Sequence, residues 1–519
     1  MRLLFIFPNI DVGGYKPLGV SILSAIARRH GCEVELFDTS FFDVSGLSSN
    51  LSYLGMKESG EEALGVIPCD TSAYNLTEVS ADIDELFMAR VREFAPDLIA
   101  VSIFSQEYHL GMHLLGLAKQ VNPAVRTIAG GVHCIADPEG VARRPEVDLI
   151  CIGEGERTIE TILLQMKEGR WEPALVPAAA YRDGDVIRKT ATGPYIELDA
   201  LPYQDNTIYD DRLFLRVYNG KVYRSLDVCL TRGCFERCVY CLFDKIYDDY
   251  GSSSVRRYGA TRFVEELEFL VAQHNIEFIR FQDSTFCNVS TKYLEELSKL
   301  YIERIGLPFV IDTTPQQVND SKVALLKAMG CQSMSIGIET GNQDMRNTFL
   351  NKKATNDHIR KAFACANDAG IRTVSFILLG FPFETRDYIF QTIRLIRECR
   401  VSSPNVGFVY PFKGSALRKT VIEKGLFDPA TEIHDTPQYT QGRPVIANPN
   451  ITAEEYQGIY RAFPFYCKFP EDYWPYIQVA EKTDPEGQAM YRRCREFYDR
   501  HNLYNRYMMV PNGDFMANR

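Results

Sequence analysis

Three cysteines stand close together near the middle of the chain, at Cys234, Cys238 and Cys241. They follow an apolar run and Gly233, a pattern that predicts a strand ending in a tight turn. Three thiolates at this spacing can wrap one face of a cubane iron–sulfur cluster, which leaves the fourth iron open to another molecule. A zinc site would need a fourth Cys or His nearby in a paired spacing, and none follows. The spacing therefore favours a 4Fe–4S cluster.

The other cysteines and the histidines are weaker candidates for metal chemistry. Most of the 14 cysteines stand singly among apolar residues, as Cys151, Cys331 and Cys365 do, and we expect these to be core residues. His109 and His113 are four residues apart, but no third ligand accompanies them. Metal binding is therefore expected at the three clustered cysteines.

Composition limits the possible partners. The 519 residues carry 57 Lys and Arg against 68 Asp and Glu, a net charge of −11. This sign argues against a nucleic-acid partner, because phosphate backbones attract basic surfaces. The first apolar run ends at Pro8, too short for a secretory signal, and no other run approaches the ~18 residues that span a bilayer. We therefore expect a cytoplasmic protein without a membrane partner.

The first 170 residues alternate short apolar runs with helical periodicity. Strands are predicted at 2–7, 33–37, 98–102, 127–129 and 149–152, and helices at 18–29, 83–94, 108–120 and 158–167. This alternation predicts an α/β fold with a doubly wound, Rossmann-like parallel sheet over residues 1–170. Such sheets bind ligands beyond the carboxyl ends of their strands.

A second series of strand–helix units fills residues 216–427, after a linker at 171–215 that carries one hairpin with an Asp-Gly turn. Its strands are predicted at 226–230, 278–281, 309–312, 333–338, 374–379 and 405–410. Six such units predict a partial (β/α)6 TIM-type barrel, whose chemistry gathers at the carboxyl ends of its strands.

Residues 428–519 lack this alternation and are rich in aromatic residues. We expect a small, mainly helical C-terminal domain there. Its aromatic side chains, such as Phe463, Phe465, Tyr466 and Trp474, are expected to close one side of the barrel, and plain core packing is the alternative for each of them.

The cysteine motif, with Tyr240 as the aromatic residue before the last cysteine, resembles the radical SAM superfamily. In that family S-adenosylmethionine (SAM) chelates the open iron, and its reductive cleavage gives methionine and a 5′-deoxyadenosyl radical. The later strand ends agree with the family pattern at residues 281–286, 335–341 and 379–382. The resemblance therefore implies a SAM site built at these strand ends.

By that resemblance, Asp283 stands near the methionyl amino group of SAM and Glu339 reaches its ribose hydroxyls. Ser335, Leu379 and Gly380 would line the same cofactor. Many family members carry a Gly-Gly-Glu element in place of Asp283, and this departure is typical of one subgroup. The alternative for Glu339 is a strand-end carboxylate that caps the next helix.

The glycine-containing loops of residues 1–170, taken in order, resemble the cobalamin-binding domain. The residues concerned are Asp11, Gly13, Gly14, Ser102, Gly130, Gly131, His133, Gly153 and Glu154. The resemblance implies that Gly130 and Gly131 let the nucleotide tail of cobalamin pass close to the backbone, beside Ser102. Better-known relatives carry a cobalt-binding histidine where this chain has Gly13, so cobalamin would lack a histidine axial ligand. For His133, a hydrogen bond to the backbone is the alternative.

Together the two resemblances imply a cobalamin-dependent radical SAM enzyme. A C–H bond without acidity cannot be deprotonated by His or Glu, so hydrogen-atom abstraction replaces general-base catalysis. The favoured reaction methylates an unactivated carbon of a small-molecule or natural-product substrate, with an electron donor such as flavodoxin or ferredoxin. The alternative is radical cyclisation, ring rearrangement or oxidation without net methyl transfer, as other members of the two-domain family perform. A cobalamin sensor or carrier is a more distant alternative.

Overall fold

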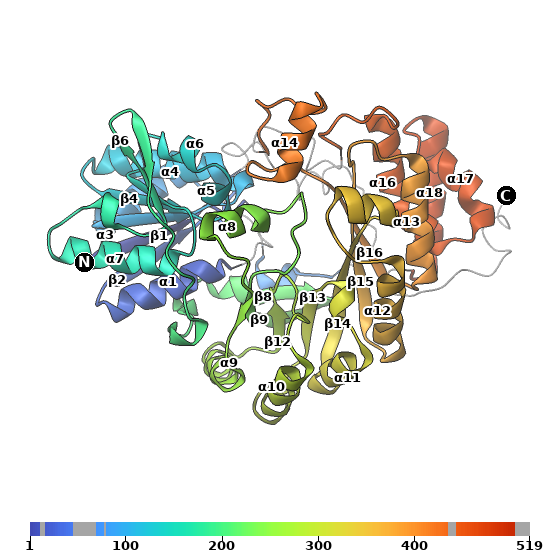
Figure 1. Ribbon diagram of the computed structural model, residues 1–519, viewed down its shortest axis with the longest axis horizontal. Coiled ribbons are helices and arrows are strands. Elements are labelled where there is room, and N and C mark those ends of the chain that lie inside the picture. Colours follow the sequence, from blue (N-terminus) through green and yellow to red (C-terminus); the bar gives the residue numbers. More distant parts are fainter. Residues whose placement is uncertain (11–15, 45–68, 77–78, 434–442, 504–519) are drawn as a thin grey trace.

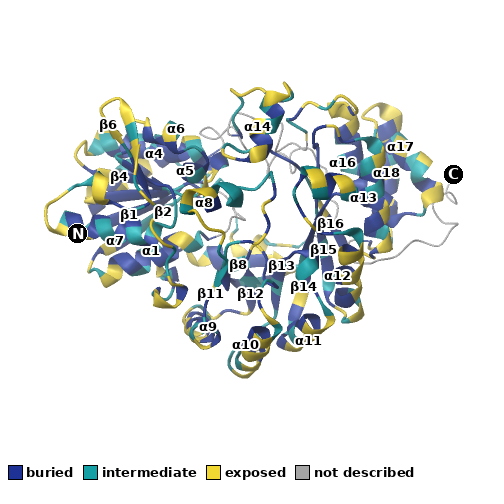
Figure 2. Cartoon of the chain, viewed as in Figure 1, coloured by how far each residue is buried: buried dark blue, intermediate teal, exposed yellow. Residues whose placement is uncertain are grey.

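The computed structural model describes residues 1–10, 16–44, 69–76, 79–433 and 443–503. Two β-sheets lie side by side, and a group of helices follows the second sheet (Figure 1). Buried residues run through both sheets and the inner faces of their helices (Figure 2). The α/β fold class is confirmed. Within the described ranges, no helix is both long enough and apolar enough to cross a bilayer.

The first sheet has the strand order β2-β1-β3-β4-β5-β6-β7, and β1 to β5 pair in parallel. Its strands are β1 (Arg2–Phe7), β2 (Glu33–Asp38), β3 (Leu98–Ser102), β4 (Arg126–Gly130), β5 (Leu149–Cys151), β6 (Ala179–Asp183) and β7 (Val186–Lys189). Its helices are α1 (Leu18–Arg29), α3 (Ile83–Phe94), α4 (Tyr108–Val121), α5 (Val132–Ala136), α6 (Pro138–Ala142) and α7 (Gly155–Lys167). The strand order reverses beside β1, which makes the carboxyl ends of β1 and β3 the switch point where such sheets bind ligands.

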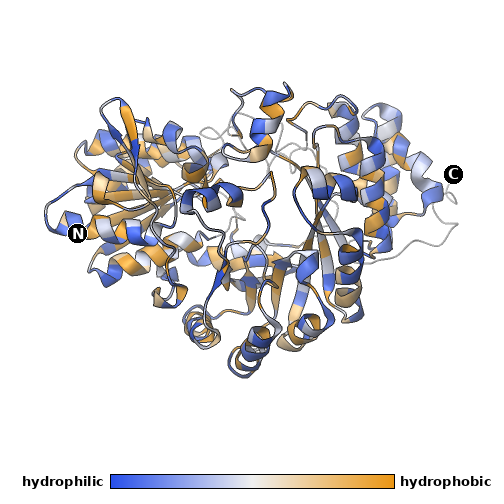
Figure 3. Cartoon of the chain, viewed as in Figure 1, coloured by the Kyte–Doolittle hydropathy of each residue, from blue (hydrophilic) through white to orange (hydrophobic). Residues whose placement is uncertain are grey.

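Alternating side chains explain why this sheet is covered on both faces. Leu3 and Phe5 of β1 pack in the same core as helices α1 and α7, whereas Leu4 and Ile6 pack with α3 and α4. Successive residues of a strand point to opposite faces, so a strand that is apolar at every position needs two layers of helices. The strands are accordingly strongly hydrophobic, and the outward helix faces are hydrophilic (Figure 3).

The hairpin expected in the linker extends this first sheet. β6 pairs antiparallel with β5 through Ala179 and Ala180, and β7 pairs antiparallel with β6. Both alanines are fully buried, because they cover the edge of the short strand β5. The hairpin is therefore part of the first sheet and not a free-standing element of a linker.

The second sheet has the strand order β16-β15-β14-β13-β12-β9-β8 and curls into a half-barrel (Figure 1). Its strands are β8 (Leu215–Tyr218), β9 (Lys221–Val228), β12 (Phe278–Phe281), β13 (Phe309–Thr313), β14 (Cys331–Glu339), β15 (Arg372–Leu379) and β16 (Ser403–Phe408). From β9 to β16 they pair in parallel and in chain order, as the six predicted units require. The sequence did not predict β8, which pairs antiparallel with β9 at the edge.

Helices cover the outer face of the half-barrel and leave the inner face more open. The helices of this part are α8 (Phe243–Tyr250), α9 (Ala260–His274), α10 (Thr291–Arg304), α11 (Asp320–Met329), α12 (Asn356–Asp368), α13 (Arg386–Glu398) and α14 (Ala416–Glu423). Along β15, Ile377 and Leu379 are buried in the core with these helices, whereas Val374, Phe376 and Leu378 are half-buried. The half-buried set therefore faces the hollow of the half-barrel.

The C-terminal part is helical, with α16 (Ala453–Lys468), α17 (Trp474–Ala480) and α18 (Pro485–Arg500). Its aromatic side chains pack against α13: the ring of Phe390 lies 5.0 Å from Tyr466 and 5.2 Å from Trp474. Phe463 and Phe465 are fully buried in the same core. The described part of this segment is helical, as expected, and these aromatic side chains pack in a core behind α13, as the alternative for them predicts.

Candidate active site

The cysteine loop connects β10 (Thr231–Arg232) to α8, just beyond the first parallel strand of the half-barrel. Gly233 opens the loop with a φ of +102°, and a Cβ atom there would lie 2.4 Å from the carbonyl oxygen of Ser254. Only glycine fits this turn. The N–H of Cys241 donates to the carbonyl oxygen of Cys238 at 3.0 Å. The backbone therefore holds the loop in a defined shape.

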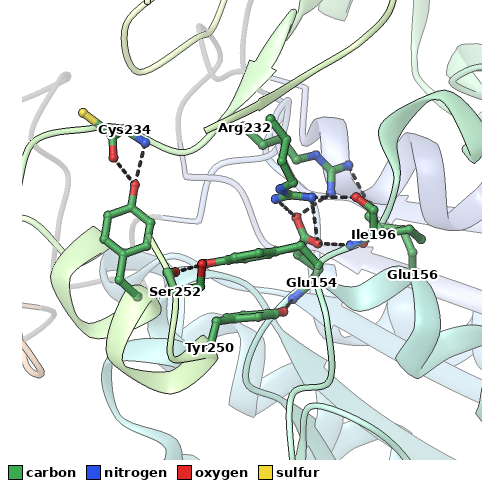
Figure 4. A network of polar contacts seen from close by, with 10 residues as sticks. Glu154, Glu156, Ile196, Arg232, Cys234, Tyr250 and Ser252 are labelled. Carbon is green, nitrogen blue, oxygen red and sulfur yellow. Dashed lines mark hydrogen bonds and ion pairs between the residues drawn. The ribbon is translucent and has the colours of Figure 1, made fainter. Parts of the chain in front are cut away.

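Tyr247 of α8 holds the first cysteine. The backbone N–H of Cys234 donates to the Tyr247 hydroxyl at 2.6 Å, and this hydroxyl donates in turn to the carbonyl oxygen of Cys234 (Figure 4). The tyrosine is 2% exposed, so water does not compete for these bonds. The position of Cys234 therefore depends on the position of α8.

The three thiols suit a cluster by their surroundings. Cys234 and Cys238 are buried and Cys241 is half-buried. Burial raises the pKa of all three thiols, that of Cys238 to about 12, so a bound cation is needed to make them thiolates. In the described part of the chain, no group of three His, Cys, Asp or Glu side chains could hold a single metal ion. A cubane cluster does not need such a group, because each of its thiolate ligands binds a different iron.

Tyr240 links the cysteine loop to the end of the fifth parallel strand. Its ring lies 6.3 Å from that of Phe381, and its hydroxyl lies within electrostatic reach of Cys238. Burial raises the pKa of the Tyr240 phenol, so the group stays a neutral hydrogen-bond donor. The side chain therefore packs against the 379–382 loop beside the cysteine loop.

Glu339 ends β14 with a φ of +64° and forms a buried ion pair with Lys352. Glu339 Oε1 lies 2.8 Å from Lys352 Nζ, and the two side chains are 9% and 5% exposed. A Cβ atom on Gly337 would lie 2.8 Å from both atoms, so this glycine leaves room for the pair. The carboxylate therefore faces an ammonium group and caps no helix, contrary to the alternative considered for it.

Lys352 also lies within electrostatic reach of all three cysteines. Burial alone would lower its pKa, but Glu339 and Cys238 raise the pKa above its ordinary value, so the group is charged. This charge would offset the negative charge of a thiolate-ligated cluster. Sequence reasoning missed the residue because it is one of two adjacent lysines, a pattern typical of exposed loops, and Lys353 is indeed exposed.

Ser335 lies in register with Asp312 of β13 and Val374 of β15, on the hollow face of the half-barrel. Burial raises the pKa of the neighbouring Asp312 carboxyl group. Leu379 is buried instead, and its carbonyl oxygen accepts the N–H of Val409 at 2.9 Å. Of these two predicted residues, Ser335 therefore presents its side chain to the hollow and Leu379 does not.

Gly380 has a φ of +83°, and its N–H donates to Glu384 Oε2 at 2.9 Å. The same oxygen accepts the hydroxyl of Tyr456 from α16, also at 2.9 Å. Glu384 is 1% exposed, and burial raises its pKa to about 7. The C-terminal helices thereby brace the loop of Gly380, a contact that no local sequence pattern indicates.

Asp283 has other partners than the resemblance implied. Its carboxylate accepts the N–H groups of Leu230 at 3.0 Å and of Thr231 at 2.6 Å, and also the Thr231 hydroxyl. The side chain is 2% exposed, and burial raises its pKa to about 6. Asp283 therefore braces the turn that leads into the cysteine loop.

Ser102 and Gly130 lie side by side in register at the carboxyl ends of β3 and β4. A Cβ atom on Gly131, which has a φ of +99°, would lie 2.6 Å from the carbonyl oxygen of Ile103. Glycine is thus required there by the packing of two strand-end loops. At Gly130 a Cβ atom would meet Cys151 at 3.7 Å and the carbonyl oxygen of Val101 at 4.0 Å, which are ordinary contacts.

His133 is 3% exposed, and its Nδ1 lies 2.9 Å from the hydroxyl oxygen of Ser105. The described partner of this ring nitrogen is therefore a side chain. His113 Nε2 lies 2.8 Å from Asp84 Oδ1 of α3, so this nitrogen has a partner other than a metal shared with His109. Outside the described residues lie Asp11, Gly13 and Gly14.

The carboxyl edge of the first sheet faces the half-barrel. Ion pairs that join them are Lys16–Asp227 at 3.4 Å, Asp137–Lys413 at 2.8 Å and Glu154–Arg232 at 3.1 Å. Lys16, Asp137 and Glu154 follow β1, β4 and β5, so the contacts arise where a doubly wound sheet binds its ligand. Gly153 and Glu154, expected at cobalamin, therefore contact the second domain in this structure.

Lys16 is a second residue that sequence reasoning missed. It is 2% exposed, and its ammonium group donates to the carbonyl oxygens of Leu213 and Ser225 as well as to Asp227. Burial lowers its pKa to about 8 although Asp227 acts to raise it. Its place in a glycine-rich loop after the first strand was the only signal in the sequence.

Two protein-family models match the chain. The Radical SAM superfamily matches residues 228–396, and the B12 binding domain matches residues 70–163. The first range contains the three cysteines and Glu339, and the second contains Ser102, Gly130 and Glu154. The matches therefore cover both halves of the candidate site.

Similar proteins include enzymes of two kinds. An anaerobic magnesium-protoporphyrin IX monomethyl ester cyclase of Rubrivivax gelatinosus is 23% identical over 459 residues, which are 86% of this chain and 73% of the relative. An uncharacterised methyltransferase of Pyrococcus horikoshii is 24% identical over 425 residues, which are 80% of this chain and 86% of the relative. Each kind of activity is a property of the relative.

One solved structure shares the fold over nearly the whole chain. It is TsrM from Kitasatospora setae, a radical S-adenosylmethionine methyltransferase with cobalamin and a 4Fe–4S cluster bound. The two superpose with a TM-score of 0.65 at 14% identity, over 96% of this chain and 99% of TsrM. The chain therefore combines a region matched by the radical SAM superfamily with one matched by the B12 binding domain, and it shares its overall fold with TsrM.

Proposed function

We propose that the enzyme is a cobalamin-dependent radical SAM methyltransferase that methylates an unactivated carbon of a small molecule. One arrangement carries the proposal: the carboxyl edge of the first sheet is held against the cysteine loop by Glu154 and Arg232. The methyltransferases of Pyrococcus horikoshii and Kitasatospora setae support it. When bound, the cluster with SAM supplies a 5′-deoxyadenosyl radical, and cobalamin supplies the methyl group.

In this proposal each part of the chain holds one set of cofactors. Residues 1–170 hold cobalamin, with Ser102 and Gly130 at its slot, and residues 216–427 hold the cluster and SAM. Cys234, Cys238 and Cys241 bind the cluster. The proposed contacts to SAM are made by Ser335, Glu339 and Gly380. The residues of the chain orient the reactants and keep water away from the radical.

The hollow face of the half-barrel is the proposed substrate site. It combines half-buried apolar side chains, Val374, Phe376 and Leu378, with the polar pair Ser335 and Asp312. Such a lining suits a small organic molecule that carries both apolar and hydrogen-bonding groups. An electron donor such as flavodoxin or ferredoxin is also required, because SAM cleavage is reductive.

The coproducts test the proposal. Methylation by this route consumes one SAM as the radical source and a second as the methyl source, so 5′-deoxyadenosine and S-adenosylhomocysteine should form in equal amounts with the methylated product. Both should fall together when cobalamin is omitted from anaerobic reconstitution. Chromatography with mass spectrometry measures all three. If 5′-deoxyadenosine forms without S-adenosylhomocysteine or a methylated product, the cyclase-type reaction, which the Rubrivivax gelatinosus relative supports, is correct instead.

We also propose that cobalamin is bound without a histidine axial ligand. Gly13 stands where better-known relatives carry that histidine, and His133 is buried against Ser105. The electron paramagnetic resonance spectrum of the cob(II)alamin form should therefore show no nitrogen superhyperfine splitting. Splitting that disappears in His109→Ala would show that His109 is the ligand and would overturn the proposal.

A further inference from the structure

Glu154 lies between β5 and α7 and receives four N–H donors from outside its own loop (Figure 4). Its Oε1 accepts from Arg232 at 3.1 Å and from Arg256 at 2.5 Å. Its Oε2 accepts from Arg256 at 3.2 Å and from the backbone N–H of Ile196, also at 3.2 Å. One carboxylate of the first domain is thus saturated by groups from the linker and the half-barrel.

The two arginines need this carboxylate. Arg232 of β10 and Arg256 of β11 (Arg256–Arg257) are directly opposite each other in an antiparallel pair, where like charges repel. Glu156 adds a second anion, 2.6 Å from Arg232. Burial would raise the pKa of Glu154, but Arg232 and Arg256 hold the pKa below its ordinary value, so the group is ionised. Glu154 therefore stabilises the short β10–β11 pair directly.

Aromatic side chains also contact the residues around Glu154. The backbone N–H of Glu154 donates to the Tyr250 hydroxyl at 2.8 Å, and a Cβ atom on Gly153 would lie 2.5 Å from that oxygen. The Tyr250 ring stacks on Tyr195 at 4.2 Å with an interplanar angle of 8°, and Arg256 lies 4.3 Å from the Tyr195 ring. The close approach of the Tyr250 side chain to the first domain thus leaves no room for a Cβ atom at Gly153 unless that side chain shifts.

These contacts hold both ends of the segment that carries the cysteines. Arg232 stands two residues before Cys234, and Arg256 follows α8. Within that segment, Tyr250 and Tyr247 lie on α8, and Tyr247 holds the backbone of Cys234. A displacement at Glu154 would therefore move the cysteine loop relative to the carboxyl edge of the first sheet.

We propose that Glu154 is a positioning residue that sets the distance between the cobalamin-binding edge and the cysteine loop. The proposal rests on the methyltransferase function given above. Radical formation needs only the half-barrel. Capture of a methyl group by the substrate radical also needs the first domain at the correct distance from the half-barrel. Misplacement by about 1 Å can slow a reaction about 100-fold, so a change in this distance should uncouple the two steps.

Glu154→Gln tests the proposal, because it keeps the shape of the side chain and removes its charge. With equal cluster and cobalamin content, the yield of methylated product per 5′-deoxyadenosine should fall by about tenfold or more. The matched control is Glu160→Gln on α7, which removes a half-exposed carboxylate paired with His30 at 2.9 Å. The control should keep the wild-type ratio.

A second measurement does not depend on turnover. Hydrogen–deuterium exchange of residues 232–256 should be faster in Glu154→Gln than in the wild type or in Glu160→Gln. Unchanged exchange together with an unchanged product ratio would overturn the proposal. If Glu154→Gln does not fold, Tyr250→Phe, which removes only the hydroxyl bonded to the Glu154 N–H, must show the same two effects. A wild type that forms no methylated product would instead contradict the proposed function, and the exchange data would still stand.

Discussion

Replacement of any one of Cys234, Cys238 and Cys241 by alanine should abolish formation of 5′-deoxyadenosine. Each thiolate binds a different iron, and the backbone turns at Gly233 and Cys241 hold each sulfur in its own place, so the remaining two cannot supply the missing ligand. The measurements are iron and sulfide content after anaerobic reconstitution, and 5′-deoxyadenosine by chromatography. The expected result is loss of the cluster and of SAM cleavage.

The control for these variants is Cys331→Ala. Cys331 is 2% exposed in β14, and its thiol donates to the Ser333 carbonyl oxygen at 3.4 Å. Removal of its sulfur should cost about 1 kcal/mol of stability and leave the cluster intact. Normal SAM cleavage by the triple cysteine variant would contradict the assignment of the cluster to this loop.

Lys352→Met should have the second largest effect. The change leaves Glu339 as an unpaired buried carboxylate, and breaking a buried pair in this way costs about 3–5 kcal/mol. The positive charge of Lys352 would stabilise the reduced cluster by about 2–3 kcal/mol at an effective dielectric constant of about 20. Loss of this charge should therefore lower the reduction potential of the cluster by roughly 100 mV. The rate of SAM cleavage should then fall at least about 100-fold, because its first step is reduction.

Potentiometric titration of the cluster and the initial rate of 5′-deoxyadenosine formation measure these effects. Lys353→Met is the matched control, since it removes the same charge from the adjacent, exposed residue. The control should change neither quantity, because an exposed charge is screened by water and salt. Equal effects of the two substitutions would show that the position of Lys352 is unimportant.

Most of the fold was predictable from the sequence, because strand and helix periodicity are local properties. The predicted strand 98–102 and the helices 18–29 and 83–94 agree with the structure residue for residue. The helix predicted to begin at residue 158 begins at Gly155. Glycine is a weak helix former, so the sequence did not indicate this start. In the fold, Gly155 packs closely against α1, where a Cβ atom would lie 3.3 Å from Leu23. The edge strand β8 and the pairing of the hairpin were not predictable, because pairing joins distant segments.

In the candidate site, too, features that lie within one short segment were predictable, and contacts between distant segments were not. The three cysteines could be proposed as cluster ligands from the sequence because they lie within a single loop. Glu339 was identified, but its partner Lys352 was not, since an exposed and a buried lysine look the same in a sequence. Asp283 and Glu154 were expected at cofactors, and the structure gives both of them backbone or arginine partners.

The sequence by itself therefore determined the two kinds of domain, their order and the cluster loop, because each rests on residues close together along the chain. Only the tertiary structure decided that the carboxyl edge of the first sheet faces the cysteine loop and that Glu154, Arg232 and Arg256 join them. It also decided which charges are buried, as at Lys16 and Lys352. The physical reason is that burial and ion pairing depend on which surfaces meet, and these surfaces come from residues as far apart as Glu154 and Arg256.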